Sequence, residues 1–269
     1  MISIILAVYG SNSDRVGYLV GLLRRLQLYK GIEVILVEQH KDMKLWDWVP
    51  SIGPLVYIAI KGDLFNLSWC RNVGARTASG DILVMMDADM FFGADYFDYI
   101  KQVTTYAIGW DRLFYLTWLG SQSLLARVTK GLTEEQLEEL VTGFRKSSWE
   151  ESGGDYWADF TSSRETVAQG GINVFNRKWY FEVLGGYCED FQGWGGEDTE
   201  IMNRAAALMG EYCKIPCTVL HLHHYRGTSV QGPHNNNSLQ ISMSDPIGTA
   251  EKLVKLCLGN PGHPTFLYV

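Results

Sequence analysis

The chain has 269 residues, of which 46% are hydrophobic, so it can build the core of one large domain. Its net charge of −7 and its lack of a long basic run argue against a nucleic-acid partner, because contacts to phosphates need clustered Lys and Arg side chains. No apolar run reaches the roughly 18 residues of a transmembrane helix, and the 5 irregularly spaced Cys residues are expected to be free thiols.

The first 105 residues alternate between short apolar runs and amphipathic segments. The predicted strands are 2–9, 32–37, 55–60 and 82–86, and the predicted helices are 16–26 and 67–78. Near-continuous apolar runs are typical of strands that are buried on both faces of a parallel sheet. The alternation therefore predicts an α/β fold, with a mostly parallel central sheet and helices on both faces.

Side chains that can bind a ligand follow these predicted strands. Tyr9, Glu38 and Asp87 lie at carboxyl ends of strands, where parallel sheets bind their ligands, so we expect them to share one crevice. Asp87 is followed by Ala88 and Asp89, and residues two apart in an extended segment point the same way. Two carboxylates that face each other cost stability unless a cation or a ligand separates them. The pair is therefore a candidate ligand site.

The second part of the chain is less regular. The predicted strands are 113–119, 172–175 and 214–220, and the predicted helices are 133–145, 177–184, 197–209 and 247–258. Trp118 is expected to pack in the core as part of its strand. Residues 147–167 and 227–245 are predicted loops, and residues 261–269 either pack back on the domain or stay loose.

The predicted loop at 147–167 contains Trp149 and Trp157 among glycine and polar residues. Two interpretations stay open for these aromatic side chains. They pack in the core, or they form a lid over an acceptor, because sugar rings stack on aromatic faces. Loops of this kind close over bound ligands and exclude water, so we expect 147–167 and 227–237 to become more ordered when a donor binds.

A glycine-rich turn, 193–196, runs directly into Glu197 and Asp198, which begin a predicted helix. Glycine lets a backbone approach another group closely. Acidic residues at a helix N-terminus are also favoured by the helix dipole alone, so the motif can be a simple capped helix start. The second acidic cluster, around Asp89, favours a functional site instead.

Three histidines, His221, His223 and His224, follow the predicted strand at 214–220. His221 and His223 share one face if the strand continues, whereas His221 and His224 meet if the chain turns. Opposite an Asp pair, this cluster favours a metal site over a structural role. Carboxylate oxygens with one or two imidazoles suit Mn²⁺, while Mg²⁺ prefers oxygen ligands alone and Zn²⁺ usually takes more nitrogen or sulfur.

Together these motifs resemble those of GT-A fold glycosyltransferases, in particular the β-1,4-galactosyltransferase and chondroitin-polymerase type. The motifs that carry the resemblance are Arg71-Asn72-Val73-Gly74, Asp87-Ala88-Asp89, Gly170-Gly171, Gly193-Trp194-Gly195-Gly196-Glu197-Asp198 and the histidine cluster. Residues 106–168 fit it poorly. The resemblance implies one GT-A (Rossmann-like) domain over residues 1–269, with a nucleotide-binding half at 1–105 and an acceptor-binding half at 106–269.

The resemblance also implies roles for individual residues. The donor nucleotide would be held by Tyr9, Glu38 and Arg71, with Asp87 on the ribose or the cation, and the donor sugar by the backbone at Gly170 and Gly171. The metal, Mn²⁺ or Mg²⁺, would be bound by Asp89 and by His221 or His224, with His223 as a further alternative. The acceptor would be held by Trp194 and Glu197, and Asp198 would be the general base.

The implied activity is that of a metal-dependent, inverting glycosyltransferase. It would move a sugar from a nucleotide sugar, expected to be a UDP-sugar, to a hydroxyl group of a carbohydrate or glycoconjugate acceptor. Retaining transferases of the same fold are an alternative, but they commonly carry an amide where Asp198 stands. Because the sequence contains no membrane anchor, we expect a cytoplasmic enzyme of a bacterium or virus.

Two alternatives come from other functional classes. Nucleotidyl transfer on a similar sheet normally needs a Gly-rich phosphate loop with a basic residue, and residues 9–13 contain no Lys. A non-catalytic carbohydrate-binding protein of the same fold is the second alternative. The intact Asp89, Asp198 and histidines argue against it.

Overall fold

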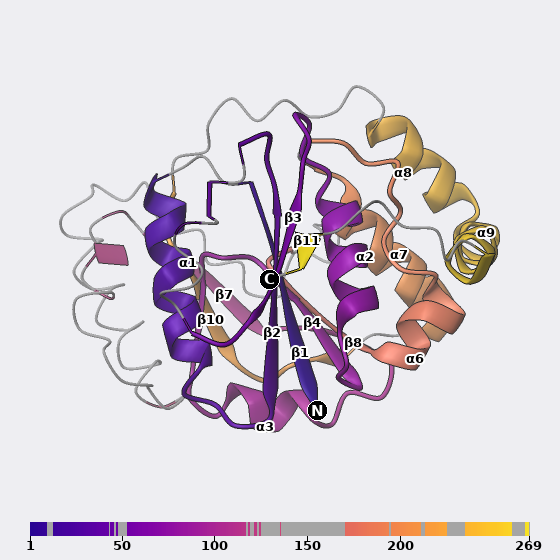
Figure 1. Ribbon diagram of the computed structural model, residues 1–269. Helices are drawn as coiled ribbons and strands as arrows, with labels where there is room; N and C mark the ends of the chain where they lie inside the picture. The colour runs from indigo at the N-terminus through magenta and orange to yellow at the C-terminus, as the bar shows by residue number, and fades with distance from the viewer. Residues whose placement is uncertain are drawn as a thin grey trace, which may run out of the picture.

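The computed structural model describes residues 1–9, 13–42, 44–45, 47, 53–116, 118, 121–122, 124, 135, 170–193, 195–210, 213–224, 235–259 and 267–268. These residues form an eight-stranded sheet with helices on both of its faces, and a three-stranded sheet packs beside it (Figure 1). The α/β architecture predicted from the alternating apolar pattern is confirmed.

The centre of the large sheet consists of four parallel strands. They are β1 (Ile2–Val8), β2 (Ile32–Gln39), β3 (Val56–Ile60) and β4 (Ile82–Met86), and they lie in the order β3-β2-β1-β4. The register places Ile4 between Val34 and Val84. Side chains of these strands are almost completely buried, as their continuous apolar runs predict. The four carboxyl ends consequently lie at one edge of the sheet.

The outer strands come from later in the chain. Next to β4 lies the antiparallel strand β8 (Ile172–Asn176), followed by β6 (Tyr106–Ile108) and the short β9 (Cys213–Lys214). At the other end, β11 (Leu267–Tyr268) pairs antiparallel with β3. Residues 267–268 therefore pack back on the domain, which was one of the two possibilities left open for 261–269, and the rest of that tail lies outside the described residues.

Helices cover the sheet from both sides. Their bounds are α1 (Ser13–Leu26), α2 (Leu67–Thr77), α3 (Tyr96–Ile100), α6 (Arg177–Trp179) with its continuation η2 (Tyr180–Leu184), α7 (Glu197–Met209), α8 (Asn235–Ser244) and α9 (Pro246–Gly259). In Figure 1, α1 lies on one side of the sheet, and α2 and α7 lie on the other. No helix among the described residues is long and apolar enough to span a membrane.

Helix α2 packs tightly on the central strands. Asn66 caps its N-terminus, because the side-chain oxygen accepts a hydrogen bond from the Trp69 N–H at 2.8 Å. Gly74 faces β1 so closely that a Cβ at this position would collide with the side chain of Ile5. The small residue lets the helix approach the sheet and fixes the side chains that α2 carries to the sheet's carboxyl edge.

The second sheet consists of β5 (Met90–Phe92), β10 (Thr218–His221) and β7 (Arg112–Tyr115), in the order β5-β10-β7. Strands β5 and β10 are antiparallel, and His221 pairs with Met90. Asp89 directly precedes β5. The pairing therefore brings an acidic residue next to the histidine cluster, although more than a hundred positions separate them in sequence.

Two strand predictions in the second part of the chain are wrong in their extent. Strand β7 ends at Tyr115, because its partner β10 ends at the paired residue His221. Trp118 therefore lies beyond the strand and is 51% exposed instead of packing in the core. The predicted strand at 214–220 is divided between β9 and β10, which belong to different sheets.

The predicted loop at 227–245 is also wrong in part, because Asn235–Ser244 forms helix α8. The buried positions of this helix include the polar residues Asn235 and Ser242, whereas Ile241 and Met243 are exposed. Hydrogen-bonded polar side chains occupy these buried positions of the helix. The apolar periodicity that reveals other helices is therefore missing. The remaining loop expectations, for 147–167 with Trp149 and Trp157 and for 227–234, lie outside the described residues.

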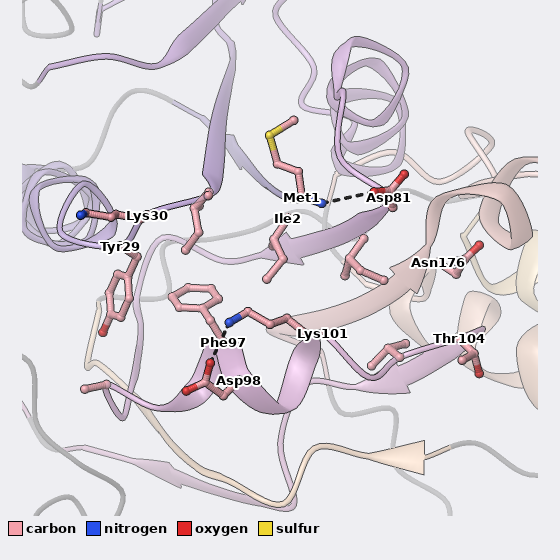
Figure 2. Close-up of a pocket in the computed structure, with 15 residues that line it drawn as sticks. Met1, Ile2, Tyr29, Lys30, Asp81, Phe97, Asp98, Lys101, Thr104 and Asn176 are labelled. Atoms are coloured by element: carbon pink, nitrogen blue, oxygen red, sulfur yellow. Dashed lines mark hydrogen bonds and ion pairs between the residues drawn. The ribbon is translucent and has the colours of Figure 1, made fainter.

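A cavity of about 570 Å³ opens at the opposite, amino edge of the large sheet (Figure 2). Its lining includes Ile2, Ile32 and Ile82, which begin three of the parallel strands. An ion pair of 2.8 Å joins Asp98 and Lys101 beside it. The strands separate this cavity from the carboxyl edge, where the sequence predicts the ligand site.

Candidate active site

A buried arginine joins two of the predicted site residues. Arg71 from α2 donates through Nη2 to Asp87 Oδ1 at 3.0 Å and through Nη1 to Asp198 Oδ1 at 2.7 Å. Its side chain is only 1% exposed, and a buried cation requires such partners because desolvation of an unpaired charge is costly. Burial alone would lower the pKa of Arg71, but Asp198, Tyr187 and Asp87 raise it well above its ordinary value. The guanidinium therefore stays charged and holds both carboxylates.

The N-terminus of α7 supplies Glu197 and Asp198. Gly196 precedes them with a φ of +98°, a conformation that favours glycine, and a Cβ here would collide with Phe191. The pKa of Glu197 is raised to about 7, first by burial and then by the charge of Asp198, while Arg71 opposes the shift. Asp198, with 15% of its side chain exposed, faces Arg71 directly. The two neighbouring carboxyl groups thus have different environments.

Two further residues contact Asp198 that were not predicted from the sequence. Asn173 on β8 donates through Nδ2 to Asp198 at 3.1 Å, and the Tyr187 hydroxyl donates at 3.3 Å. Asn173 is a polar residue between apolar neighbours in β8, which is a signal that sequence reasoning could have used. Tyr187 follows the glycine pair Gly185-Gly186 and carries no comparable signal.

The glycine pair before β8 lies where close approach was expected. The Gly171 carbonyl accepts a hydrogen bond from the Asp87 N–H at 2.8 Å. Gly171 has a φ of +99°, and a Cβ there would collide with Met90. A Cβ on Gly170 would collide with the Asp198 carboxylate. Both glycines therefore lie beside the acidic residues, while their role toward a donor sugar stays a prediction.

Asp89, His221 and His224 form a second cluster. Asp89 follows Asp87 by two residues in the chain. The Asp89 carboxylate lies 3.7 Å from His221 Nε2 and 3.2 Å from His224 Nε2, and the two imidazole rings are 5.3 Å apart. One ligand atom from each residue lies within 4.8 Å of the others. Asp89 is 2% exposed, and its backbone carbonyl accepts from Leu222 N–H at 2.8 Å. This spacing suits a single divalent cation.

The chemistry of the cluster also fits a metal. His221 Nδ1 lies 2.9 Å from the Leu222 carbonyl, which places a proton on Nδ1 and directs the lone pair of Nε2 toward Asp89. A carboxylate with two imidazoles is a donor set for a transition-metal ion such as Mn²⁺. The chain turns after β10, so His221 meets His224. His223 instead anchors the turn through its backbone, which bonds to Ser121 and to the Tyr18 hydroxyl.

The two residues predicted to bind the nucleotide base differ in exposure. Tyr9 follows β1, is 37% exposed and packs its ring 4.9 Å from His40 and 5.7 Å from Phe65. Glu38 does not line an open crevice in this structure, because its side chain is completely buried. Strand β2 continues to Gln39, so Glu38 lies inside it and accepts hydrogen bonds from the Leu45 N–H and the Tyr57 hydroxyl.

The glycine-rich turn before α7 is attached to the segment that leads into α2. The Gly193 N–H donates to the Phe65 carbonyl at 2.9 Å, next to the Asn66 cap. Trp194 lies outside the described residues, so its predicted contact with an acceptor stays a prediction. The attachment places the turn beside α2, the helix that carries Arg71.

Comparison with known protein sequences gives the family of the chain. Residues 3–232 match the family described as "Glycosyltransferase like family 2". The chain is 26% identical over 207 residues to "Probable N-acetylgalactosaminyltransferase 9" of Caenorhabditis elegans, which is 69% of this chain and 33% of that protein. It is 24% identical over 184 residues to "Chondroitin synthase" of Escherichia coli, which is 62% of this chain and 27% of that protein. The chain thus spans about a third or less of these relatives.

Solved structures show the same fold at low sequence identity. GalNAc-T7 with UDP, GalNAc and Mn²⁺ superposes with a TM-score of 0.55 and 16% identity, over 90% of this chain and 47% of that chain. TarS 1-349 of S. aureus with UDP-GlcNAc superposes with a TM-score of 0.56 and 10% identity, over 96% of this chain and 71% of that chain. These similarities establish a GT-A fold.

Proposed function

The chain belongs to the glycosyltransferase-like family 2, and on that basis we propose that it is a metal-dependent, inverting glycosyltransferase. Its donor is a nucleotide sugar with UDP as the nucleotide, and its acceptor is a hydroxyl group of a carbohydrate or glycoconjugate. The donor binds mainly to residues 1–105 and the acceptor mainly to residues 106–269.

The observation that carries this proposal is the position of Arg71 between two carboxylates. Asp87, on one side, is two residues from the Asp89–His221–His224 cluster, where a donor diphosphate would be neutralised. Asp198, on the other side, begins α7 and is the proposed general base. A donor-side group and an acceptor-side group are thus held by one buried guanidinium, which suits a transfer between the two.

Each residue has a step in the proposed reaction. Asp89, His221 and His224 would hold a divalent cation, which supplies charge neutralisation to the leaving diphosphate. Asp198 accepts the proton of the acceptor hydroxyl, and Arg71 holds its carboxylate in place. Glu197 is buried beside it and orients the acceptor, together with Trp194. Because the acceptor attacks in a single displacement, the product has the anomeric configuration opposite to that of the donor.

The choice of UDP and Mn²⁺ is supported by the ligands in two proteins of the same fold. GalNAc-T7 was solved with UDP, GalNAc and Mn²⁺, and TarS was solved with UDP-GlcNAc. Both are similar to this chain in fold alone. UDP-N-acetylglucosamine and UDP-N-acetylgalactosamine are therefore the first donors to test, and they do not define the natural donor.

A thermal-shift screen of nucleotide sugars, with and without Mn²⁺, tests the proposal. We expect UDP-sugars to raise the melting temperature only when Mn²⁺ is present, because a cation held by Asp89, His221 and His224 would supply positive charge to the diphosphate. Release of UDP should stop in EDTA. A protein that turns over UDP-sugars at full rate in EDTA, or a product that NMR shows to retain the donor's configuration, would contradict the metal-dependent or the inverting part of the proposal.

A further inference from the structure

We propose that Tyr187, Asn173 and Gly170 orient the Asp198 carboxylate so that Oδ2 is the oxygen that accepts the proton of the acceptor. The inference rests on the proposed function, since it specifies how the base of that reaction is held. Tyr187 and Asn173 are positioning residues, because they act through Asp198.

The first observation is that the hydrogen bonds converge on one oxygen. Within the described parts of the chain, three donors reach the Asp198 carboxylate, and all three end on Oδ1. They are Arg71 Nη1 at 2.7 Å, Asn173 Nδ2 at 3.1 Å and Tyr187 Oη at 3.3 Å. The donors come from α2, from β8 and from the segment after η2. Three separate elements therefore fix Oδ1 and occupy its lone pairs.

The second observation is that Tyr187 is itself held rigidly. Its ring is 1% exposed and lies 4.9 Å from the Arg71 guanidinium in a cation–π contact. Its backbone is clamped by Asn72, which accepts from the Tyr187 N–H at 2.9 Å and donates to its carbonyl at 2.8 Å. Asn72 neighbours Arg71 on α2. The same helix therefore positions two of the donors to Asp198.

Asn173 is fixed in the same way. Its Oδ1 accepts a hydrogen bond from the Tyr106 hydroxyl at 2.8 Å, so its Nδ2 faces Asp198 as a donor. The side chain is completely buried, and its strand β8 lies between β6 and β4. An amide held at both ends cannot rotate without losing a buried hydrogen bond, and this loss is unfavourable.

The third observation concerns the other carboxylate oxygen. Asp198 Oδ2 lies over Gly170, so close that any Cβ at this position would collide with it. The oxygen therefore faces a stretch of backbone without a side chain, in a carboxyl group that is 15% exposed. A proton acceptor needs an available lone pair, and among the described residues the three donors named above all engage Oδ1 and leave Oδ2 for the acceptor.

The acceptor hydroxyl oxygen forms the bond to the anomeric carbon of the donor, and its proton moves to Asp198 Oδ2. The bond from the anomeric carbon to the diphosphate breaks, and the electron pair leaves with the diphosphate oxygen. Oδ1 keeps its three donors throughout, so the carboxyl group does not have to rotate during the transfer.

Tyr187→Phe tests the positioning role, because it removes the hydroxyl and keeps the ring on Arg71. With UDP-N-acetylglucosamine and UDP-N-acetylgalactosamine as probes and Mn²⁺ present, we expect UDP release to fall about 10-fold, since each 1.36 kcal/mol is tenfold in rate. The affinity for UDP with Mn²⁺, measured by calorimetry, should not change. Tyr96→Phe is the matched control, because its buried hydroxyl donates to the Gly109 carbonyl, away from Asp198, and it should keep the wild-type rate.

A double-mutant cycle separates positioning from general destabilisation. In an Asp198→Asn background, Tyr187→Phe should cause no further loss of rate, because its effect acts through the carboxylate. An equal loss in both backgrounds would overturn the inference.

Gly170→Ala tests the same carboxylate at its other oxygen, Oδ2. The new methyl group would push Oδ2 aside, and the carboxylate at the end of its side chain can turn without disturbing the backbone. We expect a folded protein that binds UDP and Mn²⁺ but releases UDP at least 10-fold more slowly. Wild-type rates in both Gly170→Ala and Tyr187→Phe would overturn this inference but leave the proposed function standing. Absence of UDP release from the unmodified chain with every nucleotide sugar of the thermal-shift screen would overturn the proposed function and this inference with it.

Discussion

Glu197 and Asp198 are adjacent carboxyl groups in different surroundings, and this difference separates their chemical roles. Consecutive residues of a helix point about 100° apart, so the two side chains leave α7 in different directions. Asp198 forms an ion pair with Arg71, whereas burial keeps a proton on Glu197 up to a pH of about 7. Asp198 is therefore suited to accept a proton, and Glu197 is suited to donate a hydrogen bond to a sugar.

Asp198→Asn should lower kcat by roughly 10²–10⁴-fold, because the amide keeps the size of the side chain but cannot accept a proton. Binding of the donor and of Mn²⁺ should stay near that of the unmodified protein, since Asp198 does not belong to the metal cluster. Steady-state kinetics together with calorimetry of UDP binding would measure both quantities. A variant with nearly unchanged kcat would show that another group is the base.

Glu197 also makes stability depend on pH. Its pKa is raised from 4.5 to about 7 in the folded chain, so between these values the folded chain binds more protons than the unfolded chain. The free energy of unfolding therefore falls as pH rises through this window. Glu197→Gln removes the titrating group. Relative to the unmodified protein, the free energy of unfolding of this variant should therefore rise by about 1–3 kcal/mol between about pH 5 and about pH 8.

Urea unfolding at the two pH values measures this gain. Glu182→Gln is a suitable control, because Glu182 lies on η2 with 55% of its side chain exposed. The free energy of unfolding of that variant, relative to the unmodified protein, should not change between the two pH values. If Glu197→Gln and Glu182→Gln respond alike, the burial of Glu197 is not what couples folding to pH.

At the scale of elements, helix α8 supports the glycine-rich turn through hydrogen bonds. The Asn235 side chain accepts from the Gln192 N–H at 3.0 Å and donates to the Gln192 and Gly195 carbonyls at 3.0 and 2.8 Å. Ser242, near the other end of α8, donates to Glu200 at 2.6 Å. Two polar side chains thus attach α8 to the turn and to α7. The helix fixes the segment that precedes Glu197.

Asn235→Ala should lower the free energy of unfolding by about 1–3 kcal/mol, because it leaves backbone groups of the turn without their partner. It should also reduce turnover, since the turn carries Trp194 and leads into Asp198. Asn237→Ala is the matched control, because Asn237 is exposed on the same helix, and it should stay within about 0.5 kcal/mol. Chemical denaturation and UDP release, measured on both variants, would decide the point. Equal stability of the two variants would exclude the supporting role of Asn235.

The same helix shows where prediction from sequence reaches its limit. The parallel strands were predicted because strands buried on both faces have continuous apolar runs in the sequence. Asp87 and Asp89 were found because they follow such a run. Helix α8 was missed because Asn235 and Ser242 are buried through hydrogen bonds to distant segments. Periodicity reports apolar burial only.

Contacts between distant segments limited the prediction of the site in the same way. Tyr187 and Asn72 are 115 positions apart, and no local pattern pairs them. Glu38 was placed at a strand end, but one further pair in the ladder, between Gln39 and Ile60, keeps it inside the strand. The residue types of the site were thus predictable from the sequence, whereas the side chains that orient them depend on the assembled fold.

At the scale of the whole molecule, the Asp89–His221–His224 cluster joins the two sheets. Asp89 follows β4 of the large sheet and precedes β5 of the small sheet, while His221 ends β10. The ligand atoms come together only when both sheets are paired, so the unfolded chain lacks the site. A ligand that binds only the folded state stabilises it by mass action. Mn²⁺ should therefore stabilise the entire domain.

Mn²⁺ at about 100 times its dissociation constant should add about 2.7 kcal/mol to the free energy of unfolding and raise the melting temperature. Asp89→Ala and His224→Ala should lose this increase, because each removes a ligand from a cluster of three. Asp98→Ala should keep it, since Asp98 is an exposed carboxylate on α3, beside the cavity at the opposite edge of the sheet. Differential scanning calorimetry with and without Mn²⁺ provides the measurement. If Asp89→Ala still responds to Mn²⁺ as the unmodified protein does, the cation binds elsewhere and the assignment of these three ligands is wrong.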